Sequence, residues 1–247
     1  MKNIKQLSFL LLLAACVFAC QSDGKRDIEQ YYLPLEELEE GLAYEYRAVG
    51  NDSLPPYYWY FRTIEHEEKT FLTGMYYNYA FLPQQFIREE KVSNGMLLEE
   101  MFIYESDSLN EQLQIPVEVL SGSTYPFQVQ DSLGVFLYKV QWQSPRDSSV
   151  TTIIRNRRYR GSATHYAKGK TYDCIEFSIK EVIDNEKQGF LELELEGIER
   201  YAEGIGLVYS ERRLIGGDFE QKYELFERYP MTDLEAKFEQ DLDKKQD

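Results

Sequence analysis

The stretch Phe190-Leu191-Glu192-Leu193-Glu194-Leu195-Glu196 alternates apolar and acidic side chains with a period of two. Successive side chains of a β-strand point to opposite faces of a sheet. Leu191, Leu193 and Leu195 would therefore face a core, and the glutamates that alternate with them would face water. The pattern predicts a half-buried strand in a sheet with one face in the core and the other in solvent.

Similar patterns recur along most of the chain, separated by turns rich in Gly, Asn, Asp and Ser. Ile175, Phe177 and Ile179 share one face of one such segment. Further strands are predicted over residues 41–49, 57–64, 71–81, 96–104, 135–142, 151–159 and 174–183. Helix signals are sparse: residues 35–40 fit a short turn of helix, and residues 79–90 fit either a strand or a helix. We therefore predict a mostly β fold, a curved antiparallel sheet or half-barrel with few short helices.

The first twenty residues have the layout of an export signal. Lys2 and Lys5 precede an apolar run that is too short to be a membrane-spanning helix. Val17-Phe18-Ala19-Cys20 then resembles the lipobox of bacterial lipoproteins, which implies acylation of Cys20 and cleavage just before it. Leu13-Ala14-Ala15-Cys16 also resembles a lipobox, so Cys16 is the alternative site. The remaining alternative is an ordinary secretory signal that ends in a cysteine.

The leader and the acidic, Tyr-rich chain after it resemble lipoproteins of the Bacteroidota. This resemblance implies a lipid-anchored protein of the cell envelope. Gln21-Ser22-Asp23 contains a single acidic residue, a poor match to the acidic surface-export signals of that group. We therefore expect attachment to the outer membrane on the periplasmic side, with surface exposure as the alternative.

Charge restricts the partners of the folded part. The 247-residue chain has a formal net charge of −16, and loss of Lys2 and Lys5 with the leader would make it two units more negative. Nucleic-acid phosphates require a cationic face, so we expect no nucleic-acid partner. The acidity also argues against adhesion of the folded domain itself to anionic lipid. With 43% hydrophobic and 15% aromatic residues, the chain is expected to be globular.

No linker rich in Pro, Gly or Ser divides the middle of the chain, so a single domain is predicted. Thr232 can cap a short helix near the C-terminus. The predicted divisions are a signal peptide over 1–19, a polar tether over 20–33, one β-rich domain over 34–231 and a charged tail over 232–247.

Cys174 is the one cysteine left if Cys16 and Cys20 belong to the leader and the anchor. It cannot form an internal disulfide, and its place in a predicted strand indicates a buried structural thiol. Only two histidines occur, His66 and His165, whereas zinc sites use several Cys and His residues at short spacings. We expect neither a metal site nor a cofactor.

Two motifs in the C-terminal half resemble a known pattern. Residues 169–174 (Gly-Lys-Thr-Tyr-Asp-Cys) precede a segment over 199–208 that contains Tyr-Ala-Glu-Gly-Ile-Gly-Leu-Val. Together they resemble uncharacterised envelope lipoproteins with a curved antiparallel sheet, over roughly residues 130–228. The resemblance extends distantly to the half-barrel of the Lol lipoprotein carriers, which cup a lipid on an apolar concave face. From the residues alone, Gly204 and Gly206 indicate a structural hairpin, because glycine permits positive φ.

Aromatic residues are the candidate ligand contacts. Tyr57, Trp59, Tyr76 and Tyr79 could line a hydrophobic cup or stack on sugars. The alternative, which we favour, is that these rings stabilise the sheet through cross-strand pairs.

Charged residues suggest no catalytic motif. The basic run over residues 155–160 could bind an anionic partner, but cross-strand ion pairs with glutamates are favoured. The abundant acidic residues are assigned to the solvated surface. They include Glu65, Glu67, Glu68, Glu89, Glu90, Glu99 and Glu100.

Together these features predict a lipid-anchored envelope protein without enzymatic activity. Its role would be to bind a hydrophobic ligand, or a protein partner in an envelope assembly. A glycan-binding lipoprotein is the first alternative, and it would need exposed coplanar aromatic rings. An envelope hydrolase is the second, and it would need a buried pair of carboxylates in a cleft.

Overall fold

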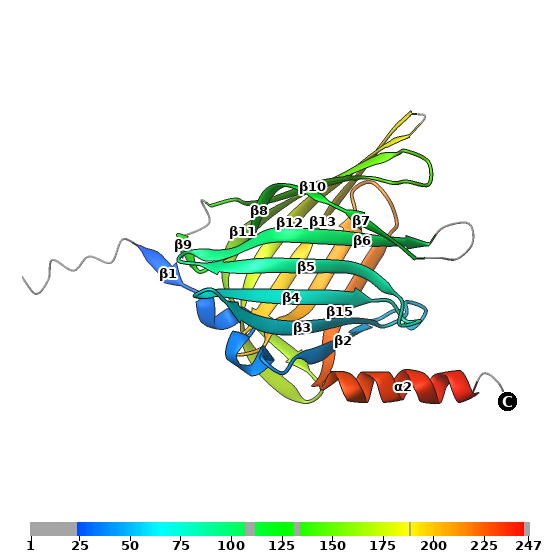
Figure 1. Cartoon of the computed structure of the whole chain (residues 1–247). Helices are drawn as coiled ribbons and strands as arrows, with labels where there is room; N and C mark the ends of the chain where they lie inside the picture. Colours follow the sequence, from blue (N-terminus) through cyan, green and yellow to red (C-terminus); the bar gives the residue numbers. More distant parts are fainter. Residues whose placement is uncertain (1–23, 107–111, 131–133, 188, 245–247) are drawn as a thin grey trace, which may run out of the picture.

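The chain forms an antiparallel β-meander whose first and last long strands pair, so that the sheet closes on itself (Figure 1). A computed structural model describes residues 24–106, 112–130, 134–187 and 189–244. Within these residues twelve strands form a closed ring. In ring order they are β2 (Leu42–Ala48), β3 (Tyr57–His66), β4 (Lys69–Tyr77), β5 (Pro83–Val92), β6 (Gly95–Ser106), β8 (Glu118–Pro126), β10 (Phe136–Gln143), β11 (Val150–Ala167), β12 (Lys170–Lys187), β13 (Gly189–Ala202), β14 (Gly206–Leu214) and β15 (Glu220–Tyr229).

The mostly β, antiparallel fold is confirmed, but the predicted curved sheet or half-barrel is incomplete, because the sheet closes into a barrel. Strand β15 pairs with β2, so that Tyr223 lies opposite Ala48 and Tyr229 opposite Ala43. Closure removes the two exposed sheet edges, whose unpaired N–H and C=O groups would otherwise be free to pair with other chains. The result is a barrel whose inward-facing side chains form the core.

Three further strands lie outside the ring. Strand β7 (Gln112–Pro116) pairs with the C-terminal half of β6, whose N-terminal end pairs with β8. Strand β1 (Lys25–Asp27) pairs with β9 (Gln128–Gln130) in a separate two-stranded sheet where the chain enters the fold. The ambiguous segment over 79–90 becomes β5 rather than a helix.

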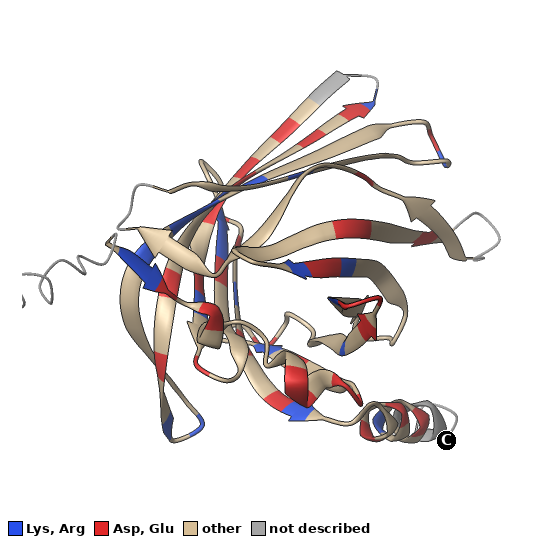
Figure 2. Cartoon of the chain, turned by 60° about the vertical axis from the view of Figure 1, so that its left-hand side comes forward, with Lys and Arg blue, Asp and Glu red and all other residues tan. Residues whose placement is uncertain are grey.

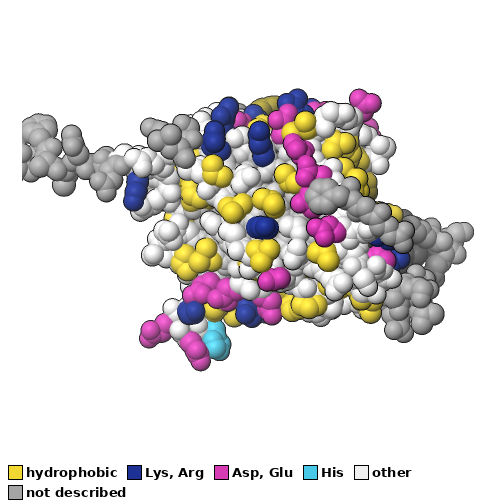
Figure 3. Space-filling view, turned by 90° about the horizontal axis from the view of Figure 1, so that it is seen from above, with side chains coloured by type: hydrophobic (Ala, Val, Ile, Leu, Met, Phe, Trp, Pro, Cys, Tyr) yellow, Lys and Arg dark blue, Asp and Glu magenta, His cyan; other side chains and the backbone are white. Residues whose placement is uncertain are grey.

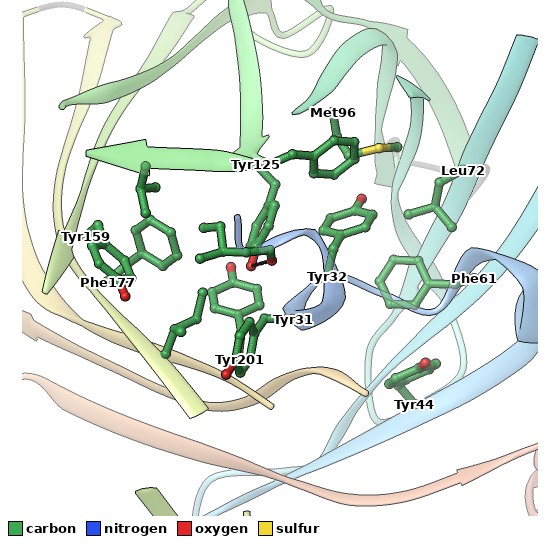
Figure 4. Packing of buried hydrophobic residues seen from close by; sticks show 14 of the residues in the cluster. Tyr31, Tyr32, Tyr44, Phe61, Leu72, Met96, Tyr125, Tyr159, Phe177 and Tyr201 are labelled. Carbon is green, nitrogen blue, oxygen red and sulfur yellow. Dashed lines mark hydrogen bonds between the residues drawn. The ribbon is translucent and has the colours of Figure 1, made fainter. Parts of the chain in front are cut away.

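Residues 28–38, which we call the plug, lie across the end of the barrel at which the chain enters (Figure 1). They contain two short 3-10 helices, η1 (Glu29–Tyr31) and η2 (Leu35–Leu38). Ile28 is fully buried, and Tyr31 and Tyr32 pack into the main core, as Figure 4 shows for the two tyrosines. The predicted polar tether over 20–33 is therefore too long, because the apolar residues at its end are part of the core.

The charged tail forms an amphipathic helix, α2 (Met231–Lys244), that lies along the outside of the barrel (Figure 1). Leu234 is fully buried in a cluster with Ala43, Tyr58 and Tyr229. Phe238 stacks on Phe81 with 4.3 Å between the ring centroids. No helix in the described part of the chain has the length and apolar character needed to span a membrane.

Strand β13 forms as its alternating pattern predicts, but its leucines do not all reach the core. Leu191 is 57% exposed and Leu193 is 36% exposed. They share a face with Glu199 and Tyr201, which are buried inside the barrel. The hairpin of β12 and β13 extends beyond the rest of the wall (Figure 1), so no opposite strand covers its far end.

Candidate functional site

The barrel contains a partly open cavity of about 200 Å³. An engineered cavity of about 150 Å³ is known to hold benzene, and pockets for drug-sized ligands begin at about 300 Å³. The lumen therefore has room for one small molecule. The lining residues come from most of the strands and from the plug: Tyr32, Leu33, Tyr46, Trp59, Phe61, Leu72, Gln85, Ile87, Glu89, Leu98, Thr124, Tyr125, Tyr138, Arg155, Arg157, Glu199, Tyr201 and Leu207.

Part of the cavity wall is aromatic and aliphatic. Trp59 stacks on Phe61 with parallel rings 5.3 Å apart, and Tyr76 lies against Trp59 at 5.4 Å. Leu72, which is fully buried, lies beside Phe61 in Figure 4. Ile87 of the neighbouring strand β5 extends this apolar surface.

The structure brings three of the four candidate aromatic residues together. Tyr57 and Trp59 lie on β3, and Tyr76 packs edge-on against Tyr57 at 5.5 Å. Of the three, only Trp59 lines the cavity directly. Tyr79 lies apart from them, 61% exposed in the turn between β4 and β5.

The remaining wall carries a buried ionic network centred on Glu199, which is 3% exposed. Arg157 donates from Nε to one Glu199 oxygen at 3.0 Å, and Arg212 forms an ion pair with the other. The Tyr201 hydroxyl donates to Glu199 at 2.8 Å. Burial opposes ionisation of Glu199, but the three nearby guanidiniums outweigh it and hold the pKa of this carboxyl well below its usual range.

Arg155 forms a second ion pair with Glu181 on β12, beside the first. Arg155 and Arg157 therefore supply the inward half of the basic run, and both bind glutamates of other strands. The predicted cross-strand pairing is confirmed for these two residues. The outward half, Arg158 and Arg160, is exposed.

Glu89 is a further buried carboxyl in the lumen, and its prediction as a surface residue is wrong. The Tyr32 hydroxyl of the plug donates a hydrogen bond to it. Burial raises the pKa of Glu89, and hydrogen bonds from Tyr32 and Thr124 and the charge of Arg157 offset only part of that rise. Glu89 is therefore the lumen carboxyl most ready to hold a proton.

The sequence contains a signal for this position. Gln85, Ile87 and Glu89 alternate on β5 and all line the cavity, so the apolar Ile87 identifies the inward face. Glu89 was assigned to the surface because it lies in a run of acidic residues, and the alternation along β5 was not considered.

The charges in and beside the cavity nearly cancel. Five of the six groups form the network: Arg155, Arg157 and Arg212 are cationic, and Glu181 and Glu199 are anionic. The sixth, Glu89, has a raised pKa. With Glu89 protonated, the set carries one net positive charge, which a single anionic group in the cavity would neutralise.

The glycine hairpin supports the plug from outside the cavity. Gly204 and Gly206 adopt φ of +67° and +95° in the turn between β13 and β14. The Gly204 N–H donates to the Gln30 carbonyl at 2.9 Å. A Cβ on Gly206 would lie 2.8 Å from a methyl carbon of Leu33, so the absence of a side chain lets the plug approach the hairpin.

Other predicted residues lie away from the cavity. Cys174 is 2% exposed, and burial raises the pKa of its thiol to about 11, so the predicted buried thiol is confirmed. His165 is buried, with its Nε2 atom 3.7 Å from a Glu224 carboxylate oxygen. Cys16 and Cys20 lie outside the described residues. The described residues contain no group of three or more His, Cys, Asp or Glu placed to hold a metal ion.

The comparisons with known proteins concern the fold. Neither a protein-family profile nor a curated protein matches this chain. One similar solved structure is that of a Bacteroides fragilis protein, provisionally described as exported and with a YmcC-like fold. It aligns with a TM-score of 0.53 and 12% sequence identity, over 80% of this chain and 98% of that one. A protein of Parabacteroides distasonis, provisionally described as a lipoprotein, aligns with a TM-score of 0.47 and 11% identity over 81% and 98%. Both neighbours come from the Bacteroidota, and the first shows that this chain has a YmcC-like fold.

Proposed function

We propose that this chain is a lipid-anchored envelope protein whose barrel binds a small amphipathic molecule with a short apolar body and a carboxylate head. The role is one of binding rather than catalysis. The single observation that carries the proposal is the cavity of about 200 Å³ with one apolar wall and one ionic wall.

The apolar wall supports a hydrocarbon body. Phe61 and Leu72 are buried, and Trp59 presents its ring beside them. Burial of apolar ligand surface contributes about 25 cal/mol for each Å² removed from water. The cavity volume favours a chain of a few carbons over a whole lipid.

The ionic wall supports a carboxylate head. When Glu89 is protonated, the three arginines and two glutamates of the network give the lumen one net positive charge. A ligand anion would neutralise this charge in a buried site, where electrostatic interactions are stronger than in water. Binding should therefore weaken as pH rises through the raised pKa of Glu89.

The anchor at Cys20 and the envelope location are proposed from the leader sequence. The Bacteroides fragilis neighbour, provisionally described as exported, supports export of a chain with this fold. Attachment to the periplasmic face of the outer membrane is the arrangement we favour.

Isothermal titration of the full chain in a nonionic detergent tests the lumen. We expect hexanoate to bind more tightly than hexanol, and hexylamine to bind most weakly, because only hexanoate neutralises the lumen charge. The cavity-filling variants Leu72→Trp and Leu98→Phe should lose hexanoate binding. Leu120→Trp is the matched control, because Leu120 is exposed on the barrel surface, and it should bind hexanoate as the unchanged chain does.

The pH dependence of hexanoate affinity tests the ionic wall of the cavity independently of the apolar wall. In the unchanged chain, hexanoate affinity should fall as pH rises through the raised pKa of Glu89, whereas Glu89→Gln should remove this fall. Equal binding of hexanoate and hexylamine would contradict the carboxylate head. Unaltered hexanoate binding in both cavity-filling variants would contradict the lumen as the site.

A further inference from the structure

The outward half of the basic run lines a groove on the outer surface of the barrel, and Arg157 is the one residue that the groove shares with the lumen lining. The groove has a volume of about 480 Å³. It lies over β11 and β12, with one wall from the segment before β10. Its lining residues are Val135, Asn156, Arg157, Arg158, Arg160, Ser178 and Lys180.

Among the residues that the structure describes, three cationic side chains of this groove have no ion-pair or hydrogen-bond partner. Arg158, Arg160 and Lys180 are exposed, and none forms an ion pair or side-chain hydrogen bond with any residue that the structure describes. Basic residues nearby behave differently: Arg155 and Arg157 bind buried glutamates. In a chain with a net charge of −16, three unpaired cations in one groove indicate a surface for an anionic partner.

The groove lies on the side where the chain enters the fold. Arg26 of β1 donates from Nη1 to the Ser162 hydroxyl at 3.0 Å, and Ser162 is two residues beyond Arg160 on β11. Figure 2 shows basic residues at the start of the chain's first strand, and Figure 3 shows several Lys and Arg side chains along one edge of the upper surface, with acidic side chains among them. Lys25 and Arg26 are themselves exposed and add to this charge.

The proposed anchor is close to the groove along the chain. Arg26 lies six positions after Cys20 in the chain. A fully extended chain spans at most about 3.6 Å per residue, so a lipid on Cys20 would hold the membrane surface within roughly 20 Å of Arg26. The groove would then lie within reach of the lipid head groups.

We propose that the groove of Arg158, Arg160 and Lys180 binds the phosphate groups of anionic phospholipids and so orients the barrel on the membrane to which it is anchored. Unpaired basic residues next to an anionic membrane surface attract it, and salt screens the attraction. The net acidity of the chain had argued against such contact, but Arg158, Arg160 and Lys180 form no ion pair with the residues that the structure describes. The inference rests on the lipid anchor proposed above and is independent of the lumen ligand.

Chemical footprinting of the full chain tests the groove. The protein is made with its own leader, purified from membranes, and inserted into nanodiscs of phosphatidylcholine with or without phosphatidylglycerol. The readout is the rate at which an amine-acetylating reagent modifies Lys180, followed by mass spectrometry. We expect phosphatidylglycerol to slow this rate by about threefold or more at low salt, and about 1 M salt to abolish the effect.

Matched variants assign the protection to the groove. In the double variant Arg158→Gln/Arg160→Gln, phosphatidylglycerol should no longer slow the acetylation of Lys180, which is still present as the measured residue. The control variant Arg62→Gln/Arg146→Gln removes the same charge from exposed positions elsewhere, and Lys180 should remain protected in it. Equal modification of Lys180 in the two bilayers, or equal protection in both variants, would overturn the proposal.

Two further results separate the remaining alternatives. The intact mass of the nanodisc-bound chain reports acylation directly. An unacylated chain would refute the anchor and the groove proposal that rests on it, whereas an acylated chain without Lys180 protection would refute the groove alone. Protection of Lys180 by polygalacturonate in phosphatidylcholine discs, equal to that by phosphatidylglycerol, would assign the groove to an acidic glycan and overturn the lipid assignment.

Discussion

Replacement of Glu199 by glutamine should destabilise the barrel strongly. Glu199 is 3% exposed and binds both Arg157 and Arg212. The amide of glutamine keeps the side-chain shape but leaves two guanidiniums without their counter-charge. Breaking a buried ion pair by removing one partner costs about 3–5 kcal/mol, and we expect Glu199→Gln to fall in this range.

Strand β13 provides a matched control in Glu196→Gln. Glu196 pairs with Arg213 on the same neighbouring strand β14 that supplies Arg212, but on the outer face, where Arg213 is 59% exposed. A surface pair of this kind contributes about 0–1 kcal/mol. The two substitutions therefore make the same chemical change, three residues apart, in a buried and in an exposed pair.

Urea unfolding followed by circular dichroism measures both free energies of unfolding. The contribution of Glu199 to the free energy of unfolding should be fully present above the unfolded carboxyl pKa of about 4.3. It should disappear as pH falls through the lowered pKa of Glu199 in the folded state. Loss of less than about 1 kcal/mol in Glu199→Gln, equal to the loss in Glu196→Gln, would refute the assignment of a buried network to the barrel wall.

Three further predictions concern other parts of the fold. Glu89→Gln should gain stability relative to the unchanged chain as pH rises above the ordinary carboxyl pKa of about 4.3, because ionisation of a buried carboxyl with a raised pKa costs stability. Glu90→Gln, which removes a carboxyl with a lowered pKa, should show no such gain in urea unfolding. Gly204→Ala should cost about 1–2 kcal/mol from its left-handed backbone alone. Gly206→Ala should cost about 1–3 kcal/mol more, because it also displaces the plug, and equal melting temperatures for the two variants would argue against that contact. Cys174, with a pKa raised to about 11, should resist maleimide in the native chain and react in urea, so rapid native labelling would contradict its burial.

The local pattern of the sequence predicts the strands but not the closure of the barrel. Alternation of apolar and polar residues is a property of each segment, so β12 and β13 could be recognised without their neighbours. Closure depends on pairing between β2 and β15, which lie near opposite ends of the chain and have no common local signature. The exposure of Leu191 and Leu193 could not be predicted for the same reason, because it depends on how far the strands on the opposite side of the barrel extend.

The candidate site could be predicted only in part. The cross-strand pairing of Arg155 and Arg157 followed from a basic run beside acidic strands. Glu89 was missed because it lies in an acidic run, and residues 28–33 of the plug were assigned to the tether because the residues before them, 21–27, are polar. The inward face of β5 and the burial of Ile28 show that alternation within such stretches carries more information than their charge.

The most direct test of the central claim is photo-crosslinking of the full chain with a hexanoate that carries a diazirine near its end, followed by mapping of the adducts by mass spectrometry. The proposal predicts adducts on Trp59, Leu72 and Ile87, and their loss in the presence of excess hexanoate. Adducts confined to exposed residues away from the cavity, such as Leu191 and Leu193 of the β12–β13 hairpin, would contradict a ligand site in the lumen.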